Sequence, residues 1–254
     1  MNFTYSIVIT FFEERDLIFN SLKSVEIQNQ KPLEIIFCGP KKCLITCNYI
    51  EKFIANSPLN AKIIYLKNDL GPGYARYIGT KNSSARIVMF LDGDDSWKES
   101  KALNQLEHMF KTNSIISGTN YYQVHNGRET RFNFKSNITY FDFIISRGLG
   151  LSTLAVDRSV AIKYLKNGHY KIAEDFKFIA LVLKNENVNA MCLQQALVKY
   201  TFNPDGLSRT RLKNLTILYN LYLELEGYFF GTIYFMLFLI SRSVTGIRRG
   251  IVNN

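Results

Sequence analysis

The chain has 254 residues, of which 47% are hydrophobic and 20% charged, a composition that excludes a disordered, collagen-like or low-complexity protein. This length can bury a full core, and it corresponds to one large domain or to one domain with an appendage. The net charge of +10 favours a polyanionic partner such as nucleic acid, an anionic membrane face or a phosphorylated substrate.

Short apolar runs alternate with helical patterns in the first part of the chain. Residues 5–11 (YSIVITF), 33–37 (LEIIF), 61–66 (AKIIYL) and 86–91 (RIVMFL) are typical of buried strands. An amphipathic stretch follows the first strand to about residue 28, and residues 71–84 form a helical pattern opened by glycine and proline. This alternation predicts a parallel, three-layer α/β sheet, in which ligands bind at the carboxyl ends of the strands.

The pattern changes after Trp97. Helices are predicted over residues 98–111, 140–147, 158–166 and 173–184. Strands are predicted over residues 114–124 and 129–134, around a turn at 125–128, and over residues 151–156. We expect residues 1–208 to form one domain with two halves, residues 1–97 and residues 98–208.

The tail over residues 209–254 is predicted to be a basic and apolar helical extension. Its uncharged run at 227–240 (GYFFGTIYFMLFLI) has fourteen residues, too few to cross a hydrocarbon core as a helix. From residue 208 onward basic residues outnumber acidic ones by four, which favours anionic headgroups. Three interpretations stay open: packing on the same domain, a homodimer contact, and peripheral membrane association through residues 227–249.

The four cysteines show no metal-binding pattern. Cys38, Cys43, Cys47 and Cys192 include no CxxC pair, and no histidine follows them at zinc-ligand spacing, so ordinary reduced thiols are expected. The first residues lack the basic start and apolar run of a signal peptide, so we expect a cytoplasmic protein.

A cluster of carboxylates follows the strand at 86–91. Asp92, Asp94 and Asp95 lie within four residues and repel one another, so they favour a compensating cation. Oxygen ligands suit Mg²⁺ or Mn²⁺, which can neutralise the charge that builds on a diphosphate leaving group. The alternative is a solvated turn that caps a helix beginning near Trp97, with Asp95 or Ser96 as the N-cap.

Five blocks of this sequence resemble, in their order, those of the family-2 glycosyltransferases, which have the GT-A fold. Residues 6–10 match the opening strand, 71–77 (GPGYARY) the glycine-rich helix and 90–95 (FLDGDD) the aspartate loop. Glu174 and Asp175 match an acidic pair, and residues 200–209 (YTFNPDGLSR) a late segment. The resemblance spans roughly residues 5–210. It implies a GT-A-like, three-layer α/β/α nucleotide-diphospho-sugar transferase domain with a C-terminal helical extension. In that domain, residues 1–97 would be the nucleotide-binding half and residues 98–208 the acceptor-side half.

The resemblance also implies roles for residues at the donor. Asp94 is expected to ligate the metal together with Asp92 and Asp95, and Asp92 also to hold the donor ribose or base. Arg76 is expected to contact the nucleotide or to fix the aspartate loop, with an ordinary surface arginine as the alternative. Ser208 and Arg209 are expected to close over the diphosphate, with a flexible loop as the alternative.

Asp175, next to Glu174 in the catalytic pair, is expected to be the general base that deprotonates the acceptor hydroxyl. An inverting transfer needs one carboxylate opposite the leaving group. The alternative is that the pair is acidic only because it begins a helix, where the dipole favours negative charge.

The sequence departs from the family pattern where the donor base is recognised. The second strand ends in FCGPKK (37–42) without an aspartate, and the opening block has Thr10 and Glu13 in a segment that differs from the usual Pro-x-Tyr-Asn. Base recognition is therefore expected to use Thr10, Glu13, backbone groups or the pair Lys41 and Lys42.

These observations predict a metal-dependent, inverting glycosyltransferase. It would move a sugar from a nucleoside-diphosphate donor to a saccharide or lipid-linked saccharide in O-antigen-like or capsule-like surface-polysaccharide biosynthesis. The predicted location is cytoplasmic, or peripheral on the inner face of the cytoplasmic membrane. The alternatives are a sugar-phosphate nucleotidyltransferase and a degenerate nucleotide-binding or membrane scaffold. Nucleic-acid binding is not expected, because no basic-aromatic stripe or known binding motif is present.

Overall fold

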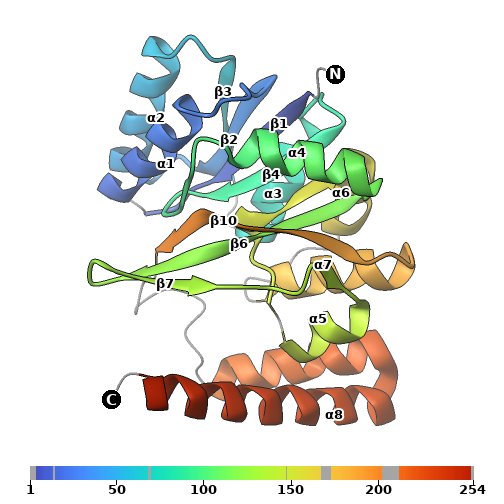
Figure 1. Ribbon diagram of the computed structural model, residues 1–254. Coiled ribbons are helices and arrows are strands. Elements are labelled where there is room, and N and C mark those ends of the chain that lie inside the picture. Colours follow the sequence, from blue (N-terminus) through green and yellow to red (C-terminus); the bar gives the residue numbers. More distant parts are fainter. Residues whose placement is uncertain are drawn as a thin grey trace.

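The computed structural model describes residues 4–13, 15–67, 70–146, 148–166, 173–201 and 212–252. One mixed sheet runs through the domain in the order β3-β2-β1-β4-β9-β6-β10-β5, with β7 beside β6 and β8 beside β10 (Figure 1). The strands are β1 Tyr5–Thr10, β2 Glu34–Pro40, β3 Ala61–Leu66, β4 Ile87–Asp92, β5 Ser96–Trp97, β6 Ile116–His125, β7 Arg128–Phe132, β8 Asn137–Ile138, β9 Ala155–Asp157 and β10 Ala190–Thr201. The helices are α1 Ile18–Glu26, α2 Leu44–Asn56, α3 Pro72–Lys81, α4 Lys101–Thr112, α5 Tyr140–Ser146, α6 Arg158–Leu165, α7 Glu174–Asn185 and α8 Leu212–Val252, with short 3₁₀ turns at Arg15–Leu17 and Leu151–Thr153.

The first four strands are parallel, and this confirms the sheet predicted from the alternating pattern. β1 pairs with β2 on one side and with β4 on the other. In this register Thr10 lies beside Cys38 of β2 and beside Asp92 of β4. The carboxyl ends of these strands therefore meet at one edge, where a ligand of a parallel sheet binds.

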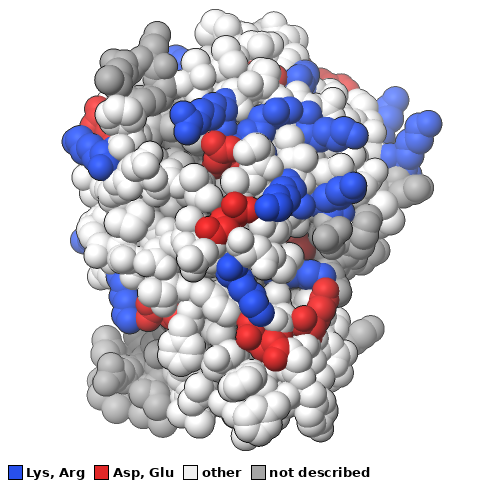
Figure 2. All heavy atoms as spheres, turned by 90° about the vertical axis from the view of Figure 1, so that its right-hand side faces the viewer, with Lys and Arg blue, Asp and Glu red and all other residues white. Residues whose placement is uncertain are grey.

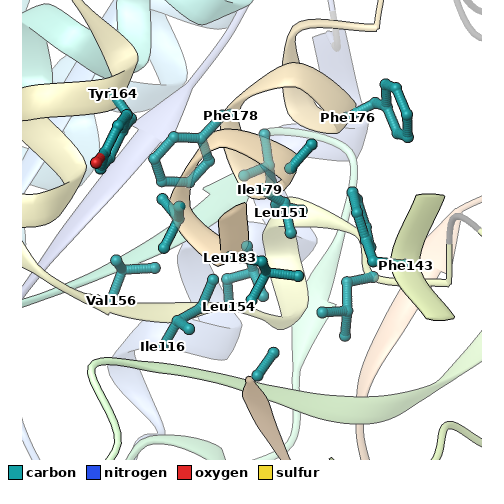
Figure 3. Packing of buried hydrophobic residues seen from close by; sticks show 14 of the residues in the cluster. Ile116, Phe143, Leu151, Leu154, Val156, Tyr164, Phe176, Phe178, Ile179 and Leu183 are labelled. Carbon is teal, nitrogen blue, oxygen red and sulfur yellow. The ribbon is translucent and has the colours of Figure 1, made fainter. Parts of the chain in front are cut away.

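The core lies on both faces of the sheet. In β1, Ile7 and Ile9 face one apolar cluster and Val8 faces the other, as the alternation of a strand requires. The second cluster includes Phe176 and Ile179 of α7 (Figure 3). Two helix-covered faces make the three-layer architecture that was predicted. Each of the four cysteines is a buried free thiol.

Two local predictions are wrong. The first three residues of the predicted strand at 151–156 form a 3₁₀ turn, in which Thr153 donates its hydroxyl to the carbonyl of Gly150 (2.6 Å). The strand β9 that follows is antiparallel to β4 and β6, so the whole sheet is mixed. The predicted helix start near Trp97 is also wrong, because Trp97 lies in β5 beside Val198 and the next helix begins at Lys101. The aspartate loop therefore does not cap that helix.

The C-terminal segment α8 is a helical hairpin below the sheet in Figure 1. Gly227 interrupts it with φ 73°, a left-handed backbone conformation that favours glycine. The helical C-terminal extension is thereby confirmed, whereas the division into domains at residue 208 stays a prediction.

Lys101 is fully buried at the start of α4. Its Nζ lies 3.7 Å from the centre of the Trp97 ring and 3.7 Å from Sδ of Met89. In the described part of the chain no carboxylate forms an ion pair with it. Burial lowers the pKa of Lys101 well below its ordinary value.

We expect Lys101→Met to stabilise the protein by about 1–3 kcal/mol near pH 7, because it removes a polar group buried without a hydrogen-bonding oxygen. The unfolded chain holds a proton on Lys101 up to about pH 10.4, whereas the folded chain releases it at lower pH. The stability of the wild type therefore rises with pH in this window, and the advantage of the variant shrinks. Denaturant unfolding at pH 7 and pH 9 measures this. If the stability difference between Lys101→Met and the wild type were as large at pH 9 as at pH 7, or larger, the burial of Lys101 as a neutral amine would be contradicted.

Candidate active site

The aspartate loop between β4 and β5 is held by main-chain contacts from neighbouring elements. The N–H of Gly93 donates to the carbonyl of Thr10 (3.0 Å), and that of Asp95 donates to the carbonyl of Asp92 (3.0 Å). The buried hydroxyl of Ser21, on α1, lies 2.8 Å from the carbonyl oxygen of Gly93 and 2.5 Å from that of Asp95. The loop conformation is therefore set by β1 and α1 as well as by its own turn.

Arg76 connects the loop to the other side of the site. Its two terminal nitrogens bind different carboxylates, Asp92 Oδ1 at 2.6 Å and Glu174 Oε1 at 2.7 Å. Only 5% of the Arg76 side chain is exposed. Burial alone would lower the pKa of Arg76, but the charges of Asp92 and Glu174 raise it above its ordinary value. The alternative of a surface arginine is wrong, because α3 points this guanidinium into the protein between two acidic segments.

Asp94 is half-buried beside Asp92. Burial and the negative charge of Asp92 raise the pKa of the Asp94 carboxyl to about 6. Within the described ranges no group of three or more His, Cys, Asp or Glu side chains is arranged to hold a metal ion. Magnesium is commonly held by one or two carboxylates together with substrate phosphates, so a pair such as Asp92 and Asp94 fits that mode of binding.

Asp95 is the last residue of the aspartate loop, and it is 1% exposed. Its Oδ1 accepts a hydrogen bond from the N–H of Thr201 at the end of β10 (3.0 Å). Burial and the negative charges of Asp94 and Asp92 raise the pKa of Asp95 well above its ordinary value. Among the described residues, its other oxygen, Oδ2, has no hydrogen-bond partner. Ser152 accepts from the N–H of Asp92 (3.1 Å), and its carbonyl accepts from the Trp97 indole (2.9 Å).

The acidic pair opens α7. Glu174 is bound to Arg76, as described above, and burial raises its pKa while the guanidinium opposes that shift. The adjacent Asp175 is half-buried, and its Oδ1 accepts a hydrogen bond from the N–H of Phe176 (2.7 Å). Ala173, just before the pair, has a left-handed backbone (φ 59°) that turns the chain into the helix. The two carboxylates therefore have distinct environments. Glu174 is paired with Arg76, whereas Asp175 accepts a hydrogen bond from a backbone N–H in the first turn of α7.

The end of the site beside β1 and β2 has a polar and an aromatic part. Thr10 donates its hydroxyl to Asp92 Oδ1 (3.2 Å), whereas Glu13 is exposed. Among the described residues no hydrogen bond or ion pair joins Glu13 to the aspartate loop. The carboxyl end of β2 approaches β1 so closely that a Cβ on Gly39 would lie 2.3 Å from the carbonyl oxygen of Phe11. A side chain does not fit at that position.

Two lysines follow this close approach. Lys42 Nζ lies 4.9 Å from the centre of the Phe12 ring, and Lys41 Nζ lies 5.6 Å from the centre of the Tyr65 ring. Phe12 is 41% exposed. The residues that take the place of the missing aspartate are therefore cationic and aromatic.

The structure thus brings Thr10, Arg76, Asp92 and Glu174 into direct contact, with Asp94 and Asp175 next to them in the chain. Ser208 and Arg209 lie outside the described residues. The sequence analysis missed Ser21, Ser152 and Thr201, which hold the aspartate loop through a hydroxyl or a backbone group. A single sequence carries no signal for them, because such contacts depend on segments that are far apart in the chain.

A parallel α/β half-sheet with Thr10 at the end of β1 and carboxylates at the end of β4, joined by Arg76 to a second acidic segment, defines a nucleotide-diphospho-sugar transferase of the GT-A type. The chain belongs to the glycosyl transferase family 2, whose family model matches residues 6–163. This confirms the predicted enzyme class, a family-2 glycosyltransferase of the bacterial surface-polysaccharide type. The comparisons give no support to the nucleotidyltransferase or scaffold alternatives.

Relatives with similar sequences cover most of the chain. One is the Escherichia coli UDP-Glc:alpha-D-GlcNAc-diphosphoundecaprenol beta-1,3-glucosyltransferase WfgD, 25% identical over 215 residues, which are 84% of this chain and 83% of that protein. Another is the Bacillus subtilis (strain 168) protein TuaG, named for teichuronic acid biosynthesis, 23% identical over 224 residues, 87% of this chain and 88% of TuaG.

Solved structures show the same fold. Staphylococcus aureus TarS 1-349 in complex with UDP-GlcNAc superposes with a TM-score of 0.70 at 18% identity, over 92% of this chain and 70% of that one. The mannosyltransferase PcManGT of Pyrobaculum calidifontis, in complex with GDP-Man and Mn²⁺, has a TM-score of 0.66 at 11% identity, over 96% and 75%. At these identities the likeness supports the fold alone.

Proposed function

We propose that this enzyme transfers a hexose from a uridine-diphosphate sugar to a saccharide linked by a diphosphate to a polyprenol lipid. WfgD and its E. coli relative WfaP, 26% identical over 190 residues, are both named for this donor and acceptor chemistry. The chain covers 83% of WfgD and 74% of WfaP, so the comparison extends over most of both proteins.

The observation that carries the proposal is the bridge made by Arg76. Arg76 pairs both with Asp92 at the carboxyl end of β4 and with Glu174 at the start of α7, which lies 98 residues after Arg76 in the sequence. A group transfer needs a place for the leaving diphosphate and a place for the acceptor base in one site. The two ion pairs of Arg76 would hold these two places at a fixed distance from each other.

A divalent cation fits the aspartate loop. The raised pKa of Asp94 and the partnerless Oδ2 of buried Asp95 both indicate negative charge that the described residues leave uncompensated. We propose that Asp94 and Asp92 would hold Mg²⁺ or Mn²⁺, and that Asp95 would support the loop from behind. Bound there, the cation would supply Lewis-acid stabilisation to the diphosphate leaving group.

The remaining chemistry belongs to side chains of this chain. In an inverting displacement, the acceptor hydroxyl oxygen bonds to the anomeric carbon while the bond from that carbon to the diphosphate oxygen breaks. Asp175 would take the hydroxyl proton, and the nucleoside diphosphate would leave with the bonding electron pair. Arg76 would hold Glu174 and Asp92 in fixed positions in the site. Thr10, Phe12 and Lys42 would form the edge of the nucleotide site.

The same proposal gives the chain its organisation and location. Residues 1–97 would bind the donor, residues 98–208 the acceptor, and residues 209–254 would form the extension. Because a polyprenol-linked acceptor is held in a membrane, the enzyme would work at the inner face of the cytoplasmic membrane.

Nucleoside diphosphates test the proposal without knowledge of the acceptor. We expect UDP with Mn²⁺ to raise the melting temperature of the purified protein, while UDP alone, Mn²⁺ alone and CDP with Mn²⁺ raise it much less, because binding to the native state stabilises it by mass action. Asp94→Asn should abolish the Mn²⁺-dependent part of the shift, whereas Glu107→Gln, an exposed carboxylate on α4, should leave it unchanged. A flat response to every nucleotide would contradict the proposed donor site.

A further inference from the structure

We infer that the second half of α8 is a docking surface for an anionic lipid membrane, on which it lies parallel to the surface. This half exposes a continuous set of large apolar side chains, called here the apolar face: Phe229, Phe230, Ile233, Met236, Leu237 and Ile240. Their exposed fractions run from 36% to 70%. Residues 229, 233, 236 and 240 follow one stripe of a helix at spacings of four, three and four.

The hairpin presents this face outward because its own contacts use the opposite side. The backbones come so close that a Cβ on Gly231 would lie 2.6 Å from the carbonyl oxygen of Tyr222 in the first half. Phe235 and Phe238 pack on Tyr222, with ring centres 5.7 and 6.1 Å apart. Tyr219 and Thr232 share a hydrogen bond (3.0 Å). Glu224 and Glu226 precede the turn at Gly227 and bind lysines of α7, and the described surface below the acidic side chains in Figure 2 shows neither acidic nor basic side chains.

The length of the apolar run favours a position in the membrane surface over a crossing. Residues 214–242 have the length and composition of a spanning helix, and 17% of their most apolar window is buried. Gly227 breaks that stretch into two antiparallel halves, however. The uncharged run at 227–240 would extend about 20 Å as a helix, whereas a hydrocarbon core is about 30 Å thick. A helix with an apolar face and flanking arginines is typical of the interface.

Charge decides between a membrane and a second copy of the chain. From residue 227 to the end there is no acidic residue, while Arg242, Arg248 and Arg249 are basic. Arg242 is exposed two residues after Ile240, and its guanidinium lies 5.7 Å from the centre of the buried Phe238 ring, on the side of the helix that packs on Tyr222. An anionic headgroup layer complements this segment, and each basic residue near such a surface contributes roughly 1 kcal/mol. If two copies met through the apolar face, the basic residues of this segment would find no acidic residue in the same segment of the other copy.

The hairpin is fixed to the helix that carries the acidic pair. Glu224 binds Lys177 of α7 (2.6 Å), and Glu226 binds Lys184 of α7 (2.8 Å). Tyr222 packs on Phe176, the residue after Asp175, with ring centres 5.2 Å apart. Docking of the hairpin would therefore hold the first turn of α7 at a fixed height above the lipid, where a lipid-linked acceptor is presented. This last step rests on the proposed function.

Vesicle binding tests the inference directly. We expect the full-length protein to co-sediment with vesicles of phosphatidylethanolamine and phosphatidylglycerol, and much less with phosphatidylcholine alone. Replacing Phe229 and Phe230 together by Gln should weaken binding by about tenfold or more, because both rings lose their place in the interface. The matched control replaces Phe19 and Phe110 by Gln; these are exposed to a similar extent (56% each) on α1 and α4, and should bind as the wild type does.

The binding assay contains no donor, acceptor or metal, so its result does not depend on the proposed function. If both double variants bound equally well, the docking surface would be wrong. A wild-type dimer in light scattering that becomes a monomer only in the Phe229 and Phe230 variant would instead identify a contact between copies and overturn the inference. Failure of transfer with every donor, while vesicle binding follows the prediction, would remove the proposed function and leave the docking surface in place.

Discussion

Asp175→Asn is expected to lower the rate of sugar transfer by about 10²–10⁴-fold, the range typical of a lost general base. Asparagine keeps an oxygen that can accept the hydrogen bond from the N–H of Phe176, so the start of α7 should keep its structure. Removing one negative charge from the helix N-terminus costs only about 0.3–1 kcal/mol of stability. The loss of activity should therefore far exceed the loss of stability.

The affinity for nucleoside diphosphate with Mn²⁺ separates this role from a general disturbance of the site. Because Asp175 would act on the acceptor, we expect the affinity of Asp175→Asn to match that of the wild type. Steady-state kinetics with a water-soluble acceptor, together with calorimetric titration of UDP, measures both quantities. If Asp175→Asn transferred sugar at a near-normal rate with normal donor affinity, Asp175 would not be the general base, and its carboxylate would only stabilise the start of α7.

Arg76→Met is expected to destabilise the protein by about 3–5 kcal/mol, because it leaves the carboxylates of Glu174 and Asp92, whose side chains are 11% and 30% exposed, without their cation. The guanidinium is 5% exposed and bonds to Asp92 and to Glu174 with separate nitrogens. The matched control is Arg86→Met, since Arg86 is 82% exposed and pairs with Asp157 at 3.4 Å. A surface pair of that kind contributes about 0–1 kcal/mol, so its variant should unfold nearly as the wild type does.

A second substitution tests whether the stranded charges cause the loss. Adding Glu174→Gln to Arg76→Met removes one of the two carboxylates, so the double variant should recover part of the stability. Urea unfolding of the four proteins gives the free energies. If Arg76→Met behaved like Arg86→Met, or if the second substitution made matters worse, the bridge would not be holding the two acidic segments together.

Much of the parallel half of the sheet could be predicted because its signals are local. The apolar runs of β1 and β4 are followed directly by Thr10 and Asp92, and parallel strands bring such ends to one edge. Arg76 is marked by the glycine-rich turn before it. Its partner Glu174 comes from a segment 98 residues away, and the resemblance to the glycosyltransferase family, more than any pattern in the chain, pointed to that pair.

What could not be predicted depends on tertiary contacts. β10 (Ala190–Thr201) gives a weak strand signal, because Gln194 and Gln195 lie in its middle, where the register to β6 shifts between Leu193 and Ala196. Trp97 looks like a helix start in sequence, but its pairing with Val198 of that same strand makes it β5. The anchors of the aspartate loop, such as Ser21, are ordinary helix residues until the fold brings the loop onto them.

The central claim is that Arg76 and the two acidic segments form one site for sugar transfer. The most direct test incubates the full-length enzyme with Mn²⁺, a UDP-hexose and a synthetic GlcNAc-diphospho-lipid, and follows the acceptor by mass spectrometry. The account predicts an acceptor heavier by one hexose, with one UDP released per transfer, and almost none of either with Asp94→Asn or Asp175→Asn. Transfer by both variants at the wild-type rate would contradict it.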